Sequence, residues 1–171
     1  MDHNDFGVTM SIEARLEEAT PFKKFDADML IRYDYLASQT LGKDHWRVAE
    51  SFKFYVGNQE DNTWVVVPAN FLTDGASVPR WLWWVAPPWS MYGQAAALHD
   101  YLIEYETMFV DDQPTYVDRK LADDIFDEAL VVNHVRWFPR KVMVLCVKAW
   151  TKFGRPKSAG YRAKKQLLER S

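Results

Sequence analysis

The sequence predicts an α+β fold, because strand patterns fill its first half and helical patterns fill its second. Residues 46–56 alternate imperfectly between apolar and polar side chains, and residues 63–67 form a β-branched run. The turn-forming residues 57–62 lie between them, an order typical of a β-hairpin. After residue 79, prolines and apolar residues at three-to-four spacing predict helices. We therefore expect a small antiparallel sheet with a β-hairpin packed against a cluster of three to four helices.

The elements are expected in the following order along the chain. They are a short helix around 12–19, a strand at 29–36, the hairpin, a helix that begins at Pro79 and ends before Pro87, a helix at 91–105, a loop at 110–115, and helices at 116–133 and 139–152. Helix 116–133 has a core stripe of Leu121, Ile125, Ala129 and Val132. The expected organisation is an N-terminal arm (1–28), a single α+β domain (29–153) and a basic C-terminal tail (154–171).

The composition limits the class of protein. At 171 residues the chain is long enough for one domain with a sizeable core. Its eight Trp predict either an aromatic core or an aromatic surface that contacts a partner. The single cysteine, Cys146, excludes an intrachain disulfide. Neither a signal peptide nor a membrane span is expected, since the start is acidic and no long apolar run occurs.

Charge is distributed unevenly. Residues 148–171 have a net charge of +7, which leaves −10 on the remainder of a chain whose net charge is −3. A basic tail on an acidic body suits an acidic partner, nucleic acid included. The alternative is a helix whose basic side chains face water. The tail lacks the aromatic or glycine interleaving typical of nucleic-acid binding, so we favour the solvated helix.

Three segments carry the chemistry-bearing residues. They are Thr-Asp-Gly-Ala-Ser-Val-Pro-Arg at 73–80, Ala-Leu-His-Asp-Tyr-Leu at 97–102 and Arg-Lys-Leu-Ala-Asp-Asp-Ile-Phe at 119–126. In this order and spacing, about residues 48–150 resemble the phage and prophage family catalogued as domain of unknown function 1353. The resemblance implies a strand, a turn, a helix with His-Asp and a helix with Ala-Asp. It also implies a phage or prophage origin, but no established activity.

Asp74, His99, Asp100 and Asp123 are the candidate catalytic residues. Two carboxylates and an imidazole, from Asp74, Asp123 and His99, suit a divalent metal such as zinc or manganese with a position left for water. Such a metal would lower the pKa of the bound water and polarise a phosphoryl or carbonyl group. Polar residues predicted to orient the ligands or hold an anion are Ser77, Arg80, Tyr101 and Arg119.

Each of these residues also has a simpler interpretation. Asp74 would cap the helix that follows the turn. His99 would be a hydrogen-bonded core residue, and Asp123 would form an i,i+4 ion pair with Arg119. Because consecutive helical residues point about 100° apart, one of His99 and Asp100 is expected to face the site. The other would cap a helix or pair with Arg80 or Arg119.

The His-Asp doublet also occurs in a class of nucleotide phosphohydrolases. Those enzymes need a further upstream histidine on a helix, and the only near candidate, His45, precedes a predicted strand. We therefore consider this match weak.

Two functions of different classes follow from the sequence. The first is a phage-encoded, metal-dependent hydrolase. The alternative is a non-enzymatic virion component of the tail or baseplate, whose arm and basic tail bind neighbouring subunits; a host-interaction protein is a third class. The expected partners are other phage proteins or further copies of this chain, and the expected location is the host cytoplasm or the virion.

Overall fold

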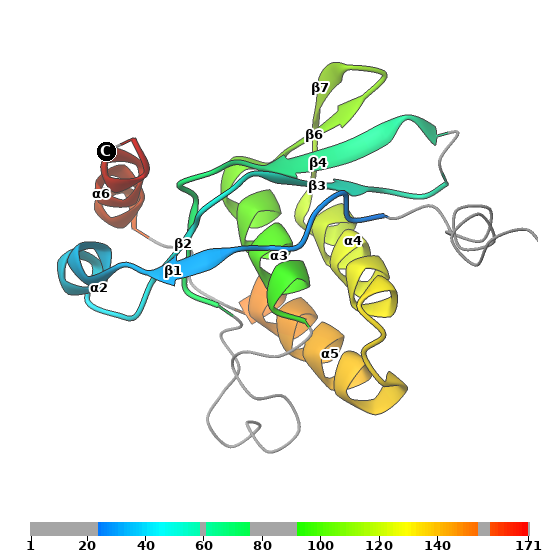
Figure 1. Ribbon diagram of the computed structural model, residues 1–171. Coiled ribbons are helices and arrows are strands. Elements are labelled where there is room, and N and C mark those ends of the chain that lie inside the picture. Colours follow the sequence, from blue (N-terminus) through cyan, green and yellow to red (C-terminus); the bar gives the residue numbers. More distant parts are fainter. Residues whose placement is uncertain (1–23, 59–60, 76–91, 154–157, 171) are drawn as a thin grey trace, which may run out of the picture.

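The structure is a computed structural model that describes residues 24–58, 61–75, 92–153 and 158–170 (Figure 1). Two antiparallel sheets have the strand orders β1-β2-β5 and β3-β4-β6-β7. Their bounds are β1 Ile31–Tyr33, β2 Trp46–Val48, β3 Phe52–Tyr55, β4 Thr63–Val67, β5 Leu72–Thr73, β6 Thr107–Val110 and β7 Gln113–Tyr116. Together with the helices, they confirm the predicted α+β class.

The helices form two groups around these sheets. Their bounds are α2 Tyr35–Leu41, α3 Gly93–Tyr105, α4 Arg119–Val132, α5 Trp137–Phe153 and α6 Ala159–Glu169. Helix α3 contacts β4, β5 and α4, and α4 in turn contacts α5. In Figure 1, α3 and α4 lie beneath the four-stranded sheet, while α2 and α6 lie together beside the smaller sheet.

The predicted hairpin is β3 and β4, paired from Phe52 opposite Val67 to Tyr55 opposite Trp64. Phe52 and Phe54 are buried on the core face, as their alternation predicts. The prediction of one strand over 46–56 was wrong. This segment is divided at residues 49–51 into two strands, β2 and β3, which belong to different sheets. The Ala49 N–H donates to the Leu30 carbonyl, so hydrogen bonding to β1 ends where the chain leaves for the larger sheet.

The predicted loop at 110–115 is instead the turn of a second hairpin, β6–β7. Val110 pairs with Gln113, which leaves a two-residue turn of Asp111 and Asp112. Their φ angles of 48° and 62° are the left-handed values of a type I′ turn. Aspartate tolerates this region, but Asp-Asp lacks the glycine that usually signals such a turn.

The predicted strand at 29–36 was too long. It ends at Tyr33, because the Asp34 side chain accepts a hydrogen bond from the Ala37 N–H at 2.9 Å and so caps α2. Helix α2 was not predicted. The aromatic and branched residues of the segment outweighed the capping signal of Asp34.

The first and the last described segments both contribute to the fold. Phe25 packs on Phe54 with ring centroids 4.7 Å apart, and Lys24 pairs with Glu128 of α4. The last residues of the predicted arm therefore join the core. The helices expected around 12–19 and from Pro79 lie outside the described residues. Residues 159–169 of the predicted basic tail form α6, in which Lys165 is only 1% exposed.

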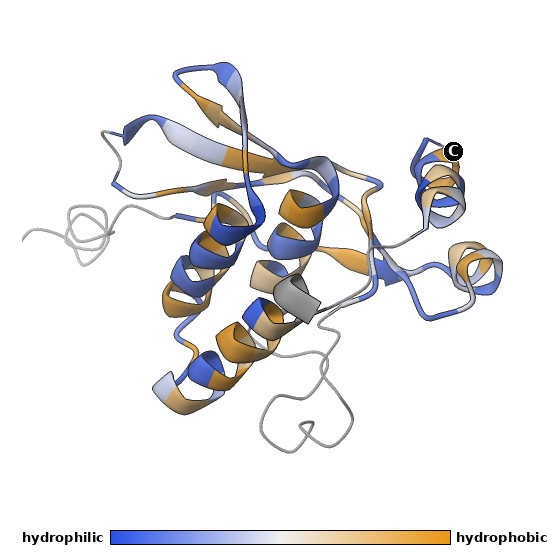
Figure 2. Ribbon diagram, turned by 180° about the vertical axis from the view of Figure 1, so that it is seen from behind, coloured by the Kyte–Doolittle hydropathy of each residue, from blue (hydrophilic) through white to orange (hydrophobic). Residues whose placement is uncertain are grey.

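The core lies between the larger sheet and helices α3 and α4. Ile125 and Ala129 of the predicted stripe are buried, and Leu121 and Val132 pack at its margin. Figure 2 shows hydrophobic and hydrophilic residues mixed around α4 and α5, as expected of helices with one buried face. Within the described ranges, no helix is long and apolar enough to cross a membrane.

Tyr92, at the start of α3, makes stability sensitive to alkali. Burial raises its pKa to about 12, from about 10 in an unfolded chain. A raised pKa means that the folded chain holds the proton more tightly. The resulting stabilisation is fully present below about pH 10 and is lost as the pH rises toward 12.

We expect the substitution Tyr92→Phe to reduce this alkaline loss. Between pH 8 and 11, the wild type should lose about 1.4 kcal/mol more of its free energy of unfolding than the variant, most of it above about pH 10. At pH 8 the two should agree within about 1 kcal/mol, because the Tyr92 hydroxyl has no hydrogen-bond partner among the described residues. Urea unfolding at pH 8, 10 and 11 measures both differences, and equal alkaline losses would contradict the assignment.

Candidate functional site

His99 and Asp123 form a buried pair between α3 and α4. The His99 Nε2 lies 2.9 Å from the Asp123 Oδ1, and the two side chains are 13% and 3% exposed. The His99 ring also packs on Phe126, with centroids 4.9 Å apart. Asp123 and Phe126 are three residues apart on α4, so both face the same side of that helix. The imidazole is therefore held at one edge by a carboxylate and along its side by an aromatic ring.

The Asp123 contact selects one tautomer of neutral His99. An ionised carboxylate only accepts hydrogen bonds, so Nε2 must carry the proton that it donates. The other ring nitrogen, Nδ1, then has a lone pair that can accept a proton or bind a metal. An Asp-oriented histidine of this kind is used both in general-base catalysis and in metal ligation.

Asp100 faces the small sheet rather than α4. Its Oδ2 accepts a hydrogen bond from the Thr73 hydroxyl at 2.7 Å, and the Thr73 oxygen accepts one from the Gly75 N–H at 3.0 Å. Gly75 has φ +73°, a conformation that glycine adopts readily. Asp100 thus ties the residues that follow β5, Asp74 and Gly75 (the turn after β5), to α3, while its neighbour His99 points to α4. This divergence follows from the 100° step between helical residues.

Asp74 has a different partner. Its carboxylate is 7% exposed and pairs with the ammonium group of Lys43. Lys43 comes from the loop after α2, so this contact joins that loop to the turn after β5. The structure therefore brings His99 and Asp123 together, but it does not join Asp74 to them by a hydrogen bond or ion pair that we can identify in the described ranges.

The described part of the chain contains no group of three or more His, Cys, Asp or Glu side chains arranged to hold a metal ion. Asp123 is committed to Nε2 of His99, which leaves Nδ1 as the nitrogen able to ligate. The three predicted ligands consequently do not form one ligand set within the described residues.

The residues predicted to orient the ligands or to hold an anion are not brought together around His99 and Asp123 in the described part of the chain. Tyr101 stacks on Tyr105 at 4.9 Å and meets Phe71 edge-on at 5.6 Å, on the side of α3 nearest α6. Burial and the nearby Glu169 carboxylate raise the pKa of Tyr101. Arg119 is the first residue of α4, and Asp123, one turn further along this helix, bonds His99. Ser77 and Arg80 lie outside the described residues.

Sequence reasoning missed three residues that shape this region. Phe126 stands three positions after Asp123, so helical spacing alone could have identified it. Thr73 lies in the quoted motif, but its hydroxyl was not considered as the link to Asp100. Lys43 is 31 residues from Asp74, and no local pattern connects them.

The chain belongs to the family of proteins of unknown function catalogued as domain of unknown function 1353, whose model matches residues 46–147. This finding confirms the resemblance inferred from the three motifs. The match contains Asp74, His99, Asp100 and Asp123, whereas α6 lies beyond it. Neither the curated proteins nor the solved structures include a significant match.

Proposed function

We propose that this member of the domain of unknown function 1353 family is a hydrolase in which His99, oriented by Asp123, acts as the general base. The observation that supports the proposal is the 2.9 Å contact between His99 Nε2 and a carboxylate that is almost fully buried. A carboxylate in that position fixes the tautomer and stabilises the imidazolium that forms when Nδ1 takes up a proton.

In the proposed reaction, Nδ1 removes a proton from water as the water oxygen attacks a carbonyl or phosphoryl centre. The bond to the leaving group then breaks, and the imidazolium returns the proton to the leaving atom. Asp123 remains ionised throughout and keeps the ring in place. The contacts of Asp100 with Thr73 and of Asp74 with Lys43 hold the turn after β5. This turn is bonded to α3, the helix that carries His99.

The metal-dependent form of this hydrolase stays a prediction. In that form, His99 Nδ1 would bind zinc or manganese while Asp123 orients the ring, since metal-bound histidines usually donate their other N–H to a carboxylate or carbonyl. Elemental mass spectrometry of the untagged protein tests it. Near-stoichiometric metal that is lost in His99→Gln would support the metal-dependent form, and absence of metal from an active enzyme would exclude it.

The hydrolase proposal is tested with His99→Gln on a panel of carboxylic esters, phosphoesters and cell-wall amides. Gln can still donate to Asp123 but has no basic nitrogen, so we expect hydrolysis to fall by about 10²–10⁴-fold. His134→Asn is the matched control, because His134 is exposed at a turn with φ +54°, which Asn tolerates. Activity that His99→Gln retains, or a wild type inactive on the whole panel, would overturn the proposal.

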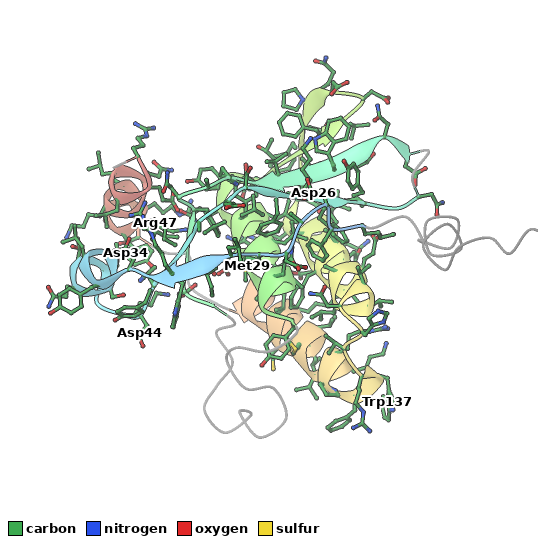
Figure 3. The ribbon with its side chains drawn as sticks, viewed as in Figure 1. Asp26, Met29, Asp34, Asp44, Arg47 and Trp137 are labelled. Atoms are coloured by element: carbon green, nitrogen blue, oxygen red, sulfur yellow. The ribbon has the colours of Figure 1, made fainter. Side chains whose placement is uncertain are left out.

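A binding role in a virion remains the second candidate, together with the phage origin inferred from the motifs. Helix α5 supports it, because Trp137, Phe138 and Leu145 are 73%, 48% and 70% exposed. Figure 3 shows Trp137 at the outer end of the helix. Exposed aromatic groups of this kind are enriched at interfaces. Self-association would be seen by light scattering and should weaken in Trp137→Ser.

A further inference from the structure

One face of α6 carries the contacts that we describe between this helix and the rest of the fold. Tyr161, Lys165, Leu168 and Glu169 are spaced four, three and one residues apart, so they share a helical face. Around them, Arg47 donates to the Leu168 carbonyl at 2.9 Å and to Asp34 at 2.7 Å. Figure 3 shows Asp34 and Arg47 between α2 and α6. Arg47 of β2, itself paired with Asp34, thus joins α6 to the small sheet by a hydrogen bond to the backbone of Leu168.

Glu169 occupies the open edge of β5. Among the described strands, β5 pairs with β2 alone, and on its other side the Leu72 N–H donates to the Glu169 Oε1 at 2.9 Å. The second Glu169 oxygen accepts from the Tyr105 hydroxyl, and the Lys165 ammonium lies 3.3 Å from the first. A side chain therefore satisfies the backbone donor that a neighbouring strand would normally satisfy.

Tyr161 supports the other side of the same turn. Its hydroxyl lies 2.8 Å from the Nε2 of buried His45, and the Lys43 ammonium lies 5.7 Å from the centre of its ring. Lys43 is the partner of Asp74. Helix α6 therefore contacts Leu72 directly, and it contacts Asp74 indirectly, through Lys43. These two residues flank Thr73, whose hydroxyl bonds Asp100.

We propose that α6 is a positioning element for the site: Glu169 and Tyr161 hold the turn after β5 in the conformation that places Thr73 against Asp100 on the helix carrying His99. Its consequence for catalysis rests on the proposed function, whereas its effect on the turn does not. Helix α6 lies beyond the segment matched by the family model, so the shared motif is held in this chain by residues outside that segment.

Amide hydrogen exchange of the full-length protein tests the proposal at Gly75, whose N–H bonds the Thr73 hydroxyl rather than α6 itself. Glu169→Ala should raise exchange at Gly75 by about tenfold or more, while exchange at Leu98 in the core of α3 stays at the wild-type rate. Glu169→Gln retains an acceptor for the Leu72 N–H and should restore much of the protection. Gln166→Ala, on the exposed side of α6, is the matched control.

Unchanged exchange at Gly75 in Glu169→Ala would overturn the proposal. If Glu169→Ala does not fold, Tyr161→Phe decides the question, because it removes only the hydroxyl that contacts His45. Equal Gly75 exchange in Tyr161→Phe and wild type would then contradict the proposed role of α6.

The proposed role of α6 and the proposed hydrolase can each fail without the other. A loosened turn in a protein without hydrolytic activity would leave the positioning role intact, whereas an active protein with an unaffected turn would leave only the hydrolase.

Discussion

Replacing Lys165 with Met is expected to lower the free energy of unfolding by about 3–5 kcal/mol. The Lys165 ammonium pairs with Glu104 and Glu169, whose side chains are only 6% and 9% exposed, and it lies 4.2 Å from the centre of the Phe71 ring. Removing the cation leaves two buried carboxylates facing each other without a positive charge. One Glu104 oxygen already has no hydrogen-bond partner among the described residues.

Urea unfolding at pH 7 measures this effect, with Lys164→Met as the matched control. Lys164 is the neighbouring residue on the exposed side of α6, so its replacement should change the free energy of unfolding by less than about 0.5 kcal/mol. Adding Glu104→Gln to Lys165→Met should recover part of the loss, because it neutralises one stranded carboxylate. A loss below 1 kcal/mol in Lys165→Met would show that water reaches these carboxylates and that the pairs contribute little.

The fold was predicted best where local pattern and burial agree. The alternation of Phe52 and Phe54 opposite a β-branched strand, and the stripe through Ile125 and Ala129, depend on single faces that the core covers. The prediction failed where contacts between residues distant in the sequence determine the structure. The ends of β2 and β3 depend on which sheet each joins, and the place of Lys165 depends on Glu104, 61 residues away.

The same distinction explains the candidate site. Asp123 and His99 were selected because each lies in a helical segment with a recognisable motif, and the structure joins them. Asp74 was grouped with them by proximity to the turn, but its partner Lys43 comes from a loop that no periodicity identifies. Sequence patterns thus indicated the polar residues of the motif, while their pairing depended on how β5, α3 and α4 pack.

Asp123→Asn is expected to lower the rate of hydrolysis by about 10³–10⁴-fold if His99 acts directly as the base. The amide group of Asn can donate as well as accept, so it can bind His99 in the other tautomer and direct the proton to Nδ1. The volume of the side chain is nearly unchanged, so the fold should be retained, as circular dichroism would show. The rate constant on any substrate found for the wild type measures the loss.

The size of that loss separates the two forms of the hydrolase. When a carboxylate orients a metal-bound histidine, its mutation typically costs only 10–100-fold. A fall of about 10–100-fold, restored by added zinc or manganese, would therefore favour the metal-dependent form over direct proton transfer. Asp127→Asn is the control, because Asp127 lies one turn further along α4 and pairs with Arg140 at 2.9 Å, away from His99. If Asp123→Asn and Asp127→Asn reduce the rate equally, the Asp123 contact has no special part in the reaction, and the His99–Asp123 pair serves only to join α3 to α4.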